Sequence, residues 1–447
     1  MILEEKMSVK VGMVSLGCSK NQVDAEIMLS ILKKAGYELC TEAGLCDVVI
    51  VNTCGFIEDA KKEAIENILE FCTLKKEGRI KAVVVTGCLA ERYKDEIANE
   101  IPEADVILGI GSNEHIVEAI EKALNGERVT RFDSKENLML DGDRIISNLP
   151  FYAYLKIADG CDNRCTYCAI PMIRGGFRSR KIENIVDEAK KLVKNGVKEL
   201  NVVAQDTTRY GEDIYGKPML CELLNELCKI DGLKWIRLLY CYPERITDEL
   251  IETVKNQPKI VKYFDVPIQH ISTPVLHRMN RRDTEESLKA LFAKIRKEIP
   301  DVVLRTTLIA GFPGETEEDF EKLCEFVKEQ QFERLGCFAY SREEGTPAAE
   351  LDGQIDDEVK ARRAEVIMDE QYLSAERYNQ SMIGKEIEVV IEGFDKYAEC
   401  FFGRSTADAP DIDPKVFITS RKGYSTGDFV KVVVDDYMEY DLIATAI

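Results

Sequence analysis

Short apolar runs alternate with amphipathic stretches along the first 140 residues, and this alternation restricts the folds open to the chain. Residues 9–16, 47–53 and 81–86 have the apolar content and the length of buried strands. A helical pattern comes after such a strand, as in residues 59–74. Strands and helices that alternate in this way form a parallel sheet covered by helices. We therefore expect an α/β domain with a parallel sheet in this part of the chain.

Each of these three strands runs into a cysteine that stands beside a glycine. The cysteines are Cys18, Cys54 and Cys88. Because ligands of open α/β sheets bind at the carboxyl ends of the strands, one sheet would bring the three thiols to one edge. They would then form a three-cysteine cluster site built from distant segments. The alternative is that each is a small buried residue at a strand end, which is common.

Residues 141–379 continue the alternation over a longer stretch. Helical patterns, such as those of residues 182–194 and 317–329, separate six strand-like runs. The runs cover residues 152–158, 199–204, 235–239, 263–266, 302–309 and 334–339. Six strands with helices between them predict a partial TIM-type (β/α)6 barrel, in which the loops after the strands carry the chemistry.

The loop after the first strand of this predicted barrel holds three cysteines in a C-x3-C-x2-C spacing. They are Cys161, Cys165 and Cys168. Three thiolates on one short loop can bind three irons of a cubane iron–sulfur cluster, whereas the usual electron-transfer cluster takes four cysteines. The remaining iron stays open to a small molecule. This indicates radical chemistry on S-adenosylmethionine.

Zinc binding and passive electron transfer are the alternatives for this loop. Zinc sites combine a C-x2-4-C pair with a second pair or with histidines downstream. The chain has no second C-x-x-C, and none of its three histidines has ligand spacing to the loop; they are His115, His270 and His277. An electron carrier with two clusters would need no open iron and would not cleave S-adenosylmethionine.

The last part of the chain changes character. Alternating and β-branched strands punctuated by glycines predict a small antiparallel β-barrel, preceded by a helical connector over residues 361–380. The expected strands cover residues 387–391, 416–418 and 429–434. Three domains follow from these patterns, at residues 1–140, 141–379 and 380–447.

Composition restricts the partners and the compartment. The net charge of −21 repels nucleic acid phosphates and favours a basic partner. The chain has no run of about 18 apolar residues that would span a membrane, and residues 1–8 lack the basic-then-apolar order of a signal peptide. We therefore expect a monomeric cytoplasmic protein whose 15 cysteines are metal ligands or buried thiols rather than disulfides.

Motifs along essentially the whole chain resemble the radical S-adenosylmethionine methylthiotransferases. This family has an N-terminal three-cysteine domain, a radical barrel and a C-terminal TRAM barrel, and Cys18, Cys54 and Cys88 match its N-terminal cluster ligands. One branch modifies an adenosine derivative in transfer RNA, and another modifies an aspartate of small-subunit ribosomal protein twelve. The motifs here resemble the second branch, and they cover residues 15–21, 204–211, 239–243, 267–270 and 340–347.

The resemblance implies two 4Fe-4S clusters, one on each set of three cysteines, and S-adenosylmethionine bound at the open iron of the radical cluster. A 5′-deoxyadenosyl radical would remove a hydrogen from the β-carbon of the aspartate, and the auxiliary cluster would deliver the methylthio group. The electron would come from a donor that the sequence does not name. No catalytic side chain beyond the cluster ligands is expected.

Four further cofactor contacts are expected from the resemblance and from the loops after the strands. They come from Tyr167, Gln205, Ile309 and Gly311. Tyr167 matches an aromatic position near the adenine. Gln205 lies where the superfamily often has a Gly-Gly-Glu stretch, from which residues 204–206 depart. Gly311 permits close backbone approach to a ligand, and a tight strand–helix turn is an equal alternative.

Charged residues in two places bear on the substrate. Three arginines follow the cysteine loop and either meet an aspartate carboxylate or form a solvated basic segment; they are Arg174, Arg178 and Arg180. Residues 380–447 hold seven Lys and Arg against thirteen Asp and Glu. An acidic TRAM barrel suits a basic ribosomal protein better than transfer RNA, although a transfer-RNA adenosine methylthiotransferase stays open as the alternative function.

Overall fold

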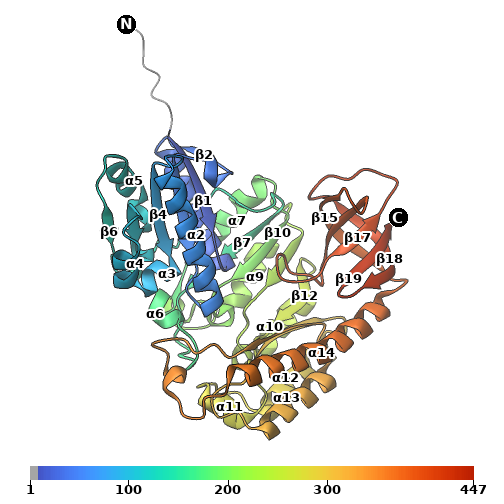
Figure 1. The fold of residues 1–447 in the computed structure, drawn as a ribbon. Helices are drawn as coiled ribbons and strands as arrows, with labels where there is room; N and C mark the ends of the chain where they lie inside the picture. Colours follow the sequence, from blue (N-terminus) through green and yellow to red (C-terminus); the bar gives the residue numbers. More distant parts are fainter. Residues whose placement is uncertain (1–8) are drawn as a thin grey trace.

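The computed structural model describes residues 9–447, so residues 1–8, whose composition argued against a signal peptide, lie outside the described residues. The first part of the chain is a parallel sheet. Its strands are β1 (Lys10–Ser15), β2 (Glu38–Cys40), β3 (Val48–Thr53), β4 (Ala82–Gly87), β5 (Val106–Leu108) and β6 (Val129–Arg131). They lie in the order β2-β1-β3-β4-β5-β6, and all neighbours are parallel. The predicted α/β class of this part is confirmed (Figure 1).

Helices cover both faces of this sheet. They are α1 (Ser19–Lys34), α2 (Glu58–Lys76), α3 (Cys88–Arg92), α4 (Lys94–Glu100) and α5 (Ile116–Leu124). Alternate residues of β3 point to opposite faces, so Val49 and Val51 pack with α2 while Val48 and Ile50 pack with α1 and α5. Every residue of β3 and β4 is buried, which explains why these strands read as continuous apolar runs.

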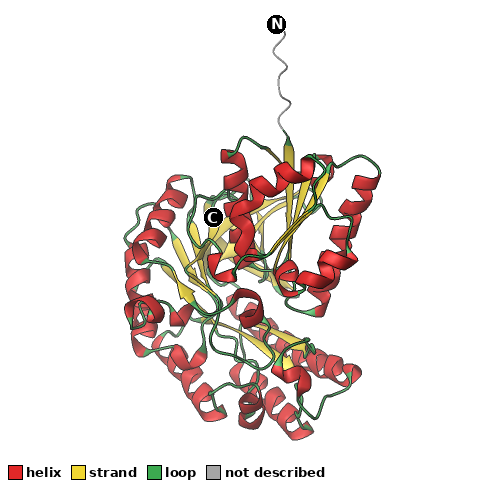
Figure 2. Cartoon of the chain, turned by 90° about the vertical axis from the view of Figure 1, so that its left-hand side faces the viewer, coloured by secondary structure: helices red, strands yellow, loops and turns green. Residues whose placement is uncertain are grey.

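The middle of the chain forms a second parallel sheet, which curves as the open barrel that the sequence predicts (Figure 2). Its strands are β7 (Tyr152–Lys156), β10 (Glu199–Val203), β11 (Trp235–Leu238), β12 (Ile260–Asp265), β13 (Val303–Ala310) and β14 (Arg334–Ala339). They lie side by side in chain order, with β7 and β14 at the two edges. A two-stranded sheet of β8 (Ala158–Asp159) and β9 (Arg178–Ser179) flanks the cysteine loop.

Helices separate these strands, and most of them cover the outer side of the barrel (Figure 2). They are α6 (Ile170–Arg174), α7 (Ile182–Lys194), α8 (Glu212–Tyr215), α9 (Leu220–Cys228), α10 (Asp248–Asn256), α11 (Thr273–Arg278), α12 (Glu285–Glu298), α13 (Glu317–Gln330) and α14 (Asp357–Met382). Short 3-10 helices lie at Ala43–Leu45, Ile110–His115, Lys135–Asn137, Thr207–Arg209, Pro243–Arg245 and Pro347–Glu350. No helix within residues 9–447 has the length and apolar character needed to cross a membrane.

The C-terminal part is a closed five-stranded barrel. Its strands are β15 (Glu386–Asp395), β16 (Cys400–Ser405), β17 (Val416–Thr419), β18 (Phe429–Met438) and β19 (Asp441–Ala446). The pairing of β17 with β19 is parallel, so the barrel is mixed rather than wholly antiparallel as the sequence predicted. The sequence analysis also missed β16 and β19. A strand pattern shows that a segment is extended but does not show the direction in which it pairs.

Buried ion pairs fix the C-terminal barrel to the central one. Arg404 of β16 donates from Nη2 to Oε2 of Glu199 at 2.7 Å, and Arg237 donates from Nε to Oε1 of the same glutamate at 3.2 Å. The side chains of all three residues are fully or almost fully buried. In the segment after β16, Asp408 pairs with Arg334 at 2.7 Å. The small barrel is therefore joined to β10, β11 and β14 of the central barrel by buried charges.

The N-terminal domain contacts both sides of the opening in the central barrel. On one side, Asp24 of α1 forms an ion pair with Lys156 at the end of β7. On the other side, Arg92 of α3 donates from Nη1 to Oε2 of Glu343, in the loop after β14, at 2.8 Å. Because β7 and β14 are the two edges of the open sheet, these contacts hold the first domain across the gap between them.

Candidate functional site

Three cysteines meet at the carboxyl edge of the N-terminal sheet. Cys18 precedes α1, Cys54 follows β3, and Cys88 begins α3 directly after β4. Their strands β1, β3 and β4 are neighbours in the sheet. Gly17 has a φ of +87°, and a Cβ atom there would lie 2.7 Å from the Sγ of Cys54. Only glycine lets the loop that carries Cys18 approach Cys54 so closely.

The three thiols have different surroundings. Cys88 is buried, and burial raises its pKa to about 12 although Arg174 acts in the opposite direction. Burial also raises the pKa of the Cys54 thiol. Cys18 is accessible to water yet has protein atoms on most sides; burial raises its pKa, but the charges of Lys20 and Arg174 outweigh this and lower it overall.

The second set of cysteines lies on the loop between β8 and α6, at the mouth of the central barrel. Neighbouring loops hold it in place: the backbone N–H of Cys161 donates to the carbonyl of Gly175 at 3.2 Å, and that of Thr166 donates to Met279 at 3.0 Å. The side chain of Asn163 donates to Asp206, just after β10, at 2.9 Å. Burial raises the pKa of the Cys161 thiol to about 12.

The donor chemistry of both sets fits an iron–sulfur cluster. None of the described cysteines forms a disulfide, so the six thiols are free to bind iron. Within residues 9–447, no three His, Cys, Asp or Glu side chains converge on one metal ion. In a cubane cluster the three thiolates bind three different irons, so they need not converge on one ion.

Helix α6 connects the two sets of cysteines. Cys88 packs in one buried cluster with Ala169 and Ile173, and Ala169 directly follows Cys168. At the end of the same helix, Arg174 donates from Nη2 to the Sγ of Cys88 at 3.4 Å. Side chains of α6, the helix that follows the cysteine loop, therefore touch Cys88 of the N-terminal domain. The two sets of cysteines are close neighbours.

Arg174 belongs to a buried network of four charges. Its Nη1 donates to Asp24 and to Asp159, each at 2.8 Å. Lys156 contacts the same two carboxylates, so two cations match two anions in the interface between the domains. Burial alone would raise the pKa of Asp159, but Arg174 and Lys156 hold it well below its usual range. The two cations and the two carboxylates are therefore buried against one another in this interface.

The two further arginines after the loop are also engaged within the chain. Arg180 pairs with Asp141 at 2.7 Å and with Glu188 at 2.5 Å. Arg178 donates to the backbone carbonyl of Glu136 at 2.6 Å. Together with the burial of Arg174, these contacts exclude the solvated basic segment that the sequence left open. The carboxylates that these arginines meet are the chain's own.

Tyr167 is part of the cysteine loop, between Cys165 and Cys168, and Gln205 lies in the loop after β10. The ring of Tyr167 packs edge-on against Phe312, with 6.5 Å between the ring centres, and Arg281 donates to its hydroxyl at 3.5 Å. The Nε2 of Gln205 donates to Asp159 at 3.3 Å, and its Oε1 has no hydrogen-bond partner within the described part of the chain. Gln205 therefore keeps one acceptor available to a ligand. Both positions stay predictions as cofactor contacts.

Ile309 and Gly311 lie at the carboxyl end of β13. Ile309 pairs with Phe338 of β14 and is partly exposed. Gly311 has a φ of +74°, and a Cβ atom there would lie 2.2 Å from the Cγ of Lys360 on α14. The space beside Gly311 is thus filled by α14, which supports the tight-turn alternative for this glycine. Its predicted contact with the cofactor stays a prediction.

Sequence reasoning missed the charged residues between the two cysteine sets. Asp24, Lys156 and Asp159 were not singled out, because charged residues on helices and at strand ends are usually solvated. The burial of Lys20, two residues after Cys18, was missed for the same reason. One signal was available in the sequence. Lys20 and Asp159 each lie two residues from a cysteine of the two sets, whereas Lys156 does not.

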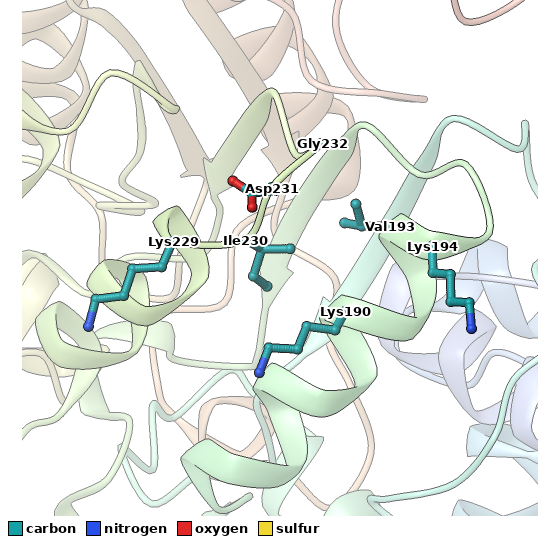
Figure 3. Close-up of a pocket in the computed structure, with 7 residues that line it drawn as sticks. All are labelled: Lys190, Val193, Lys194, Lys229, Ile230, Asp231 and Gly232. Carbon is teal, nitrogen blue, oxygen red and sulfur yellow. The ribbon is translucent and has the colours of Figure 1, made fainter.

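An open surface depression lies at the other end of the central barrel (Figure 3). It is lined by Lys190, Val193, Lys194, Lys229, Ile230, Asp231 and Gly232. These residues end α7 and α9 and precede β10 and β11, so the depression is at the amino ends of the strands. Both sets of cysteines follow the carboxyl ends. The depression is therefore separate from the candidate site.

The barrel and its cysteine loop define the class of protein: the chain is a radical S-adenosylmethionine enzyme. The profile of the radical SAM superfamily matches residues 155–327. That of the TRAM domain matches residues 383–447, and that of the uncharacterized protein family UPF0004 matches residues 10–109. Each of the three structural parts thus has a family match of its own.

Relatives of full length identify the family. The ribosomal protein uS12 methylthiotransferase RimO of Lachnoclostridium phytofermentans is 50% identical over 439 residues, which cover 98% of this chain and 100% of that protein. The protein of the same name from Clostridioides difficile is 51% identical over 436 residues, covering 97% and 98%. The one from Geobacter sulfurreducens is 50% identical over 441 residues, covering 98% of each chain. The chain belongs to the family of ribosomal protein uS12 methylthiotransferases.

Solved structures share the fold at much lower identity. The radical S-adenosylmethionine methyltransferase TsrM from Kitasatospora setae, with cobalamin and a 4Fe-4S cluster bound, superposes with a TM-score of 0.56. It is 14% identical, and the match covers 76% of this chain and 77% of that chain. This likeness supports the arrangement of sheets and shows the fold alone.

Proposed function

We propose that this chain transfers a methylthio group to the β-carbon of an aspartate in ribosomal protein uS12. The observation that carries the proposal is the identity of about half of all residues with uS12 methylthiotransferases over nearly the whole length. This identity includes the C-terminal barrel as well as the radical barrel. It therefore supports a shared substrate in addition to a shared chemistry.

The chain provides two sites for 4Fe-4S clusters. We assign the radical cluster to the loop cysteines Cys161, Cys165 and Cys168. We assign the auxiliary cluster to Cys18, Cys54 and Cys88. When bound, the clusters and S-adenosylmethionine supply a carbon radical and a methylthio group, chemistry that no side chain provides. The unpaired Oε1 of Gln205 offers an acceptor at this site, and Tyr167, Ile309 and Gly311 complete the proposed contacts with S-adenosylmethionine.

The protein's own part is to hold the two sites at a fixed separation and to exclude water. Helix α6 and the residue before it fix the separation of the two sites, because Ala169 and Ile173 pack on Cys88 while Arg174 donates a hydrogen bond to it. The N-terminal domain excludes water, since it is anchored to both edges of the open barrel. We place the domain boundaries near residues 140 and 380 and the enzyme in the cytoplasm, with uS12 as its partner.

The test is an anaerobic reaction of the reconstituted enzyme with S-adenosylmethionine, a reductant and purified uS12. Mass mapping of uS12 is expected to show one methylthio group in place of one hydrogen on an aspartate. Transfer RNA in a parallel reaction should stay unmodified. A methylthio-adenosine without any modified aspartate would contradict the proposal and favour the transfer-RNA alternative.

Variants of the cysteines separate the two sites. Cys165→Ala is expected to abolish cleavage of S-adenosylmethionine and to lower iron and sulfide by about one cluster per chain. Cys54→Ala should lower iron and sulfide by the same amount but leave 5′-deoxyadenosine formation in place, without methylthio product. Cys400→Ala, in the C-terminal barrel, is a matched control that should change neither the iron and sulfide content nor the formation of 5′-deoxyadenosine. Equal metal content in all three variants would contradict the assignment.

A further inference from the structure

A buried lysine lies between the two sets of cysteines. Lys20 is in the first turn of α1, two residues after Cys18, and only 6% of its surface is exposed. Its ammonium lies 3.4 Å from the ring centre of Tyr240, which follows β11 at the mouth of the central barrel. The side chain therefore extends from the auxiliary site toward the mouth of the central barrel.

Tyr240 is held in a strained conformation that places its ring under this ammonium. Its φ of +61° is in the left-handed region, which is unfavourable for a residue with a side chain. Two hydrogen bonds maintain it: its N–H donates to Asp265 at 3.0 Å, and its carbonyl accepts from the N–H of Thr207 at 3.1 Å. Strain of this kind persists where the surrounding structure enforces it, often at functional sites.

Lys20 has no carboxylate partner. Throughout residues 9–447, no salt bridge and no side-chain hydrogen bond of its ammonium is found, whereas the nearby Arg174 and Lys156 are matched by Asp24 and Asp159. The charges of that network cancel, so Lys20 is the cation that protein carboxylates leave uncompensated. Taking a charge out of water without a partner is costly. Besides the Cys18 thiolate, which the cluster would bind, a counter-charge for Lys20 has to come from outside the chain.

We propose that Lys20 binds the side-chain carboxylate of the substrate aspartate and so selects this residue as the target. The inference rests on the proposed function. A reaction at the β-carbon must bring that carbon between the two cysteine sets, and the carboxylate is bonded directly to it. The carboxylate must then lie in the same enclosed space, where an ammonium on an aromatic ring is the available counter-charge. Lys20 is thus a specificity-determining residue for the methylthiolation.

The test compares two synthetic peptides of the uS12 target segment, one with the mapped aspartate and one with asparagine at that position. Binding of each to the reconstituted enzyme is measured by titration under anaerobic conditions. The wild-type enzyme should bind the aspartate peptide more tightly, and Lys20→Met should reduce the ratio of the two affinities by about 30-fold or more. The ratio does not depend on the fraction of enzyme that is folded or loaded.

Two variants make the result specific. Lys20→Arg keeps a cation and should keep most of the preference for aspartate. Lys62→Met removes an exposed lysine of α2 and should leave the ratio unchanged. 5′-Deoxyadenosine formation without peptide should stay within about twofold of wild type in Lys62→Met, since neither the cysteine loop nor the proposed carboxylate site is touched.

An unchanged ratio in Lys20→Met, with a wild-type enzyme that modifies uS12, would overturn the role of Lys20 and leave the proposed function intact. Such a lysine would only balance the charge of the Cys18 thiolate, and its removal would shift the auxiliary cluster's potential instead. A wild-type enzyme that modifies no aspartate of uS12 would overturn both.

Discussion

The guanidinium of Arg174 lies 3.4 Å from the thiol sulfur of Cys88, although the two residues belong to different domains. Arg174 ends the helix that follows the radical cysteine loop, and Cys88 begins the helix that follows β4 of the N-terminal sheet. A single buried side chain thus couples the position of one set of cysteines to that of the other. Changes at Arg174 should therefore affect both the stability of the interface and the auxiliary site.

We predict that Arg174→Met destabilises the protein by about 3–5 kcal/mol, because Asp24 and Asp159 keep only Lys156 as a buried partner. Urea unfolding of the reduced, metal-free protein measures this. Lys191→Met, which removes an exposed pair with Asp143, should destabilise the protein far less, because water screens that pair. Adding Asp159→Asn to Arg174→Met should recover part of the loss. Equal costs for the two single variants would argue against the network.

The C-terminal barrel should loosen when its buried arginine is removed. Arg404→Met leaves Glu199 and Glu392 short of a partner, and we expect a loss of about 3–5 kcal/mol with faster proteolysis after α14. Limited proteolysis followed by mass analysis locates the cut. The control is Lys234→Met, which breaks an exposed contact with Glu388 of the same barrel. It should be cleaved by the protease as slowly as the wild-type protein. Identical cleavage of both variants would contradict this role.

Gly311→Ala is expected to be more destabilising than an alanine at another glycine with positive φ. Its left-handed backbone costs about 1–2 kcal/mol with a side chain, and its Cβ would also collide with Lys360. Gly196→Ala, at a φ of +105° with no atom within 4 Å, should show the backbone cost alone. Chemical denaturation measures both. In a Lys360→Ala background part of the difference should remain, because the Cβ and Cα of residue 360 would still lie 2.8 and 3.0 Å from the new Cβ. Equal costs at the two glycines in the wild-type background would contradict the collision.

Alkylation of the metal-free protein should depend on pH differently for each thiol. The pKa of Cys18 is lowered, so its thiolate fraction should be half-maximal below pH 9, the ordinary value. Burial raises the pKa of Cys88 and of Cys161 to about 12, so their rates should keep rising well above pH 9. Iodoacetamide labelling with peptide mapping gives the three rates. In urea the differences between the three labelling rates should vanish. If Cys88 is labelled as fast as Cys18 in the folded protein, its burial would be contradicted.

Most of the fold could be predicted from local patterns. The strands that precede Cys18, Cys54 and Cys88 are apolar runs, and a helix after each strand leaves a parallel sheet as the arrangement that buries them. The C-terminal barrel was predicted less completely. The parallel pairing of β17 with β19 depends on the path of the chain around the barrel, which no local pattern contains.

The sequence by itself determined which residues we assign to the chemistry, because the spacing of Cys161, Cys165 and Cys168 within one loop survives any arrangement of the rest. Only the tertiary structure decided how the two sets of cysteines relate. The pairing of Arg174 with Asp24 joins residues 150 positions apart, and the contact of Lys20 with Tyr240 crosses two domains. Whether a charge is solvated, paired or left for a substrate depends on three-dimensional distance and on the exclusion of water, and both arise only when the domains pack together.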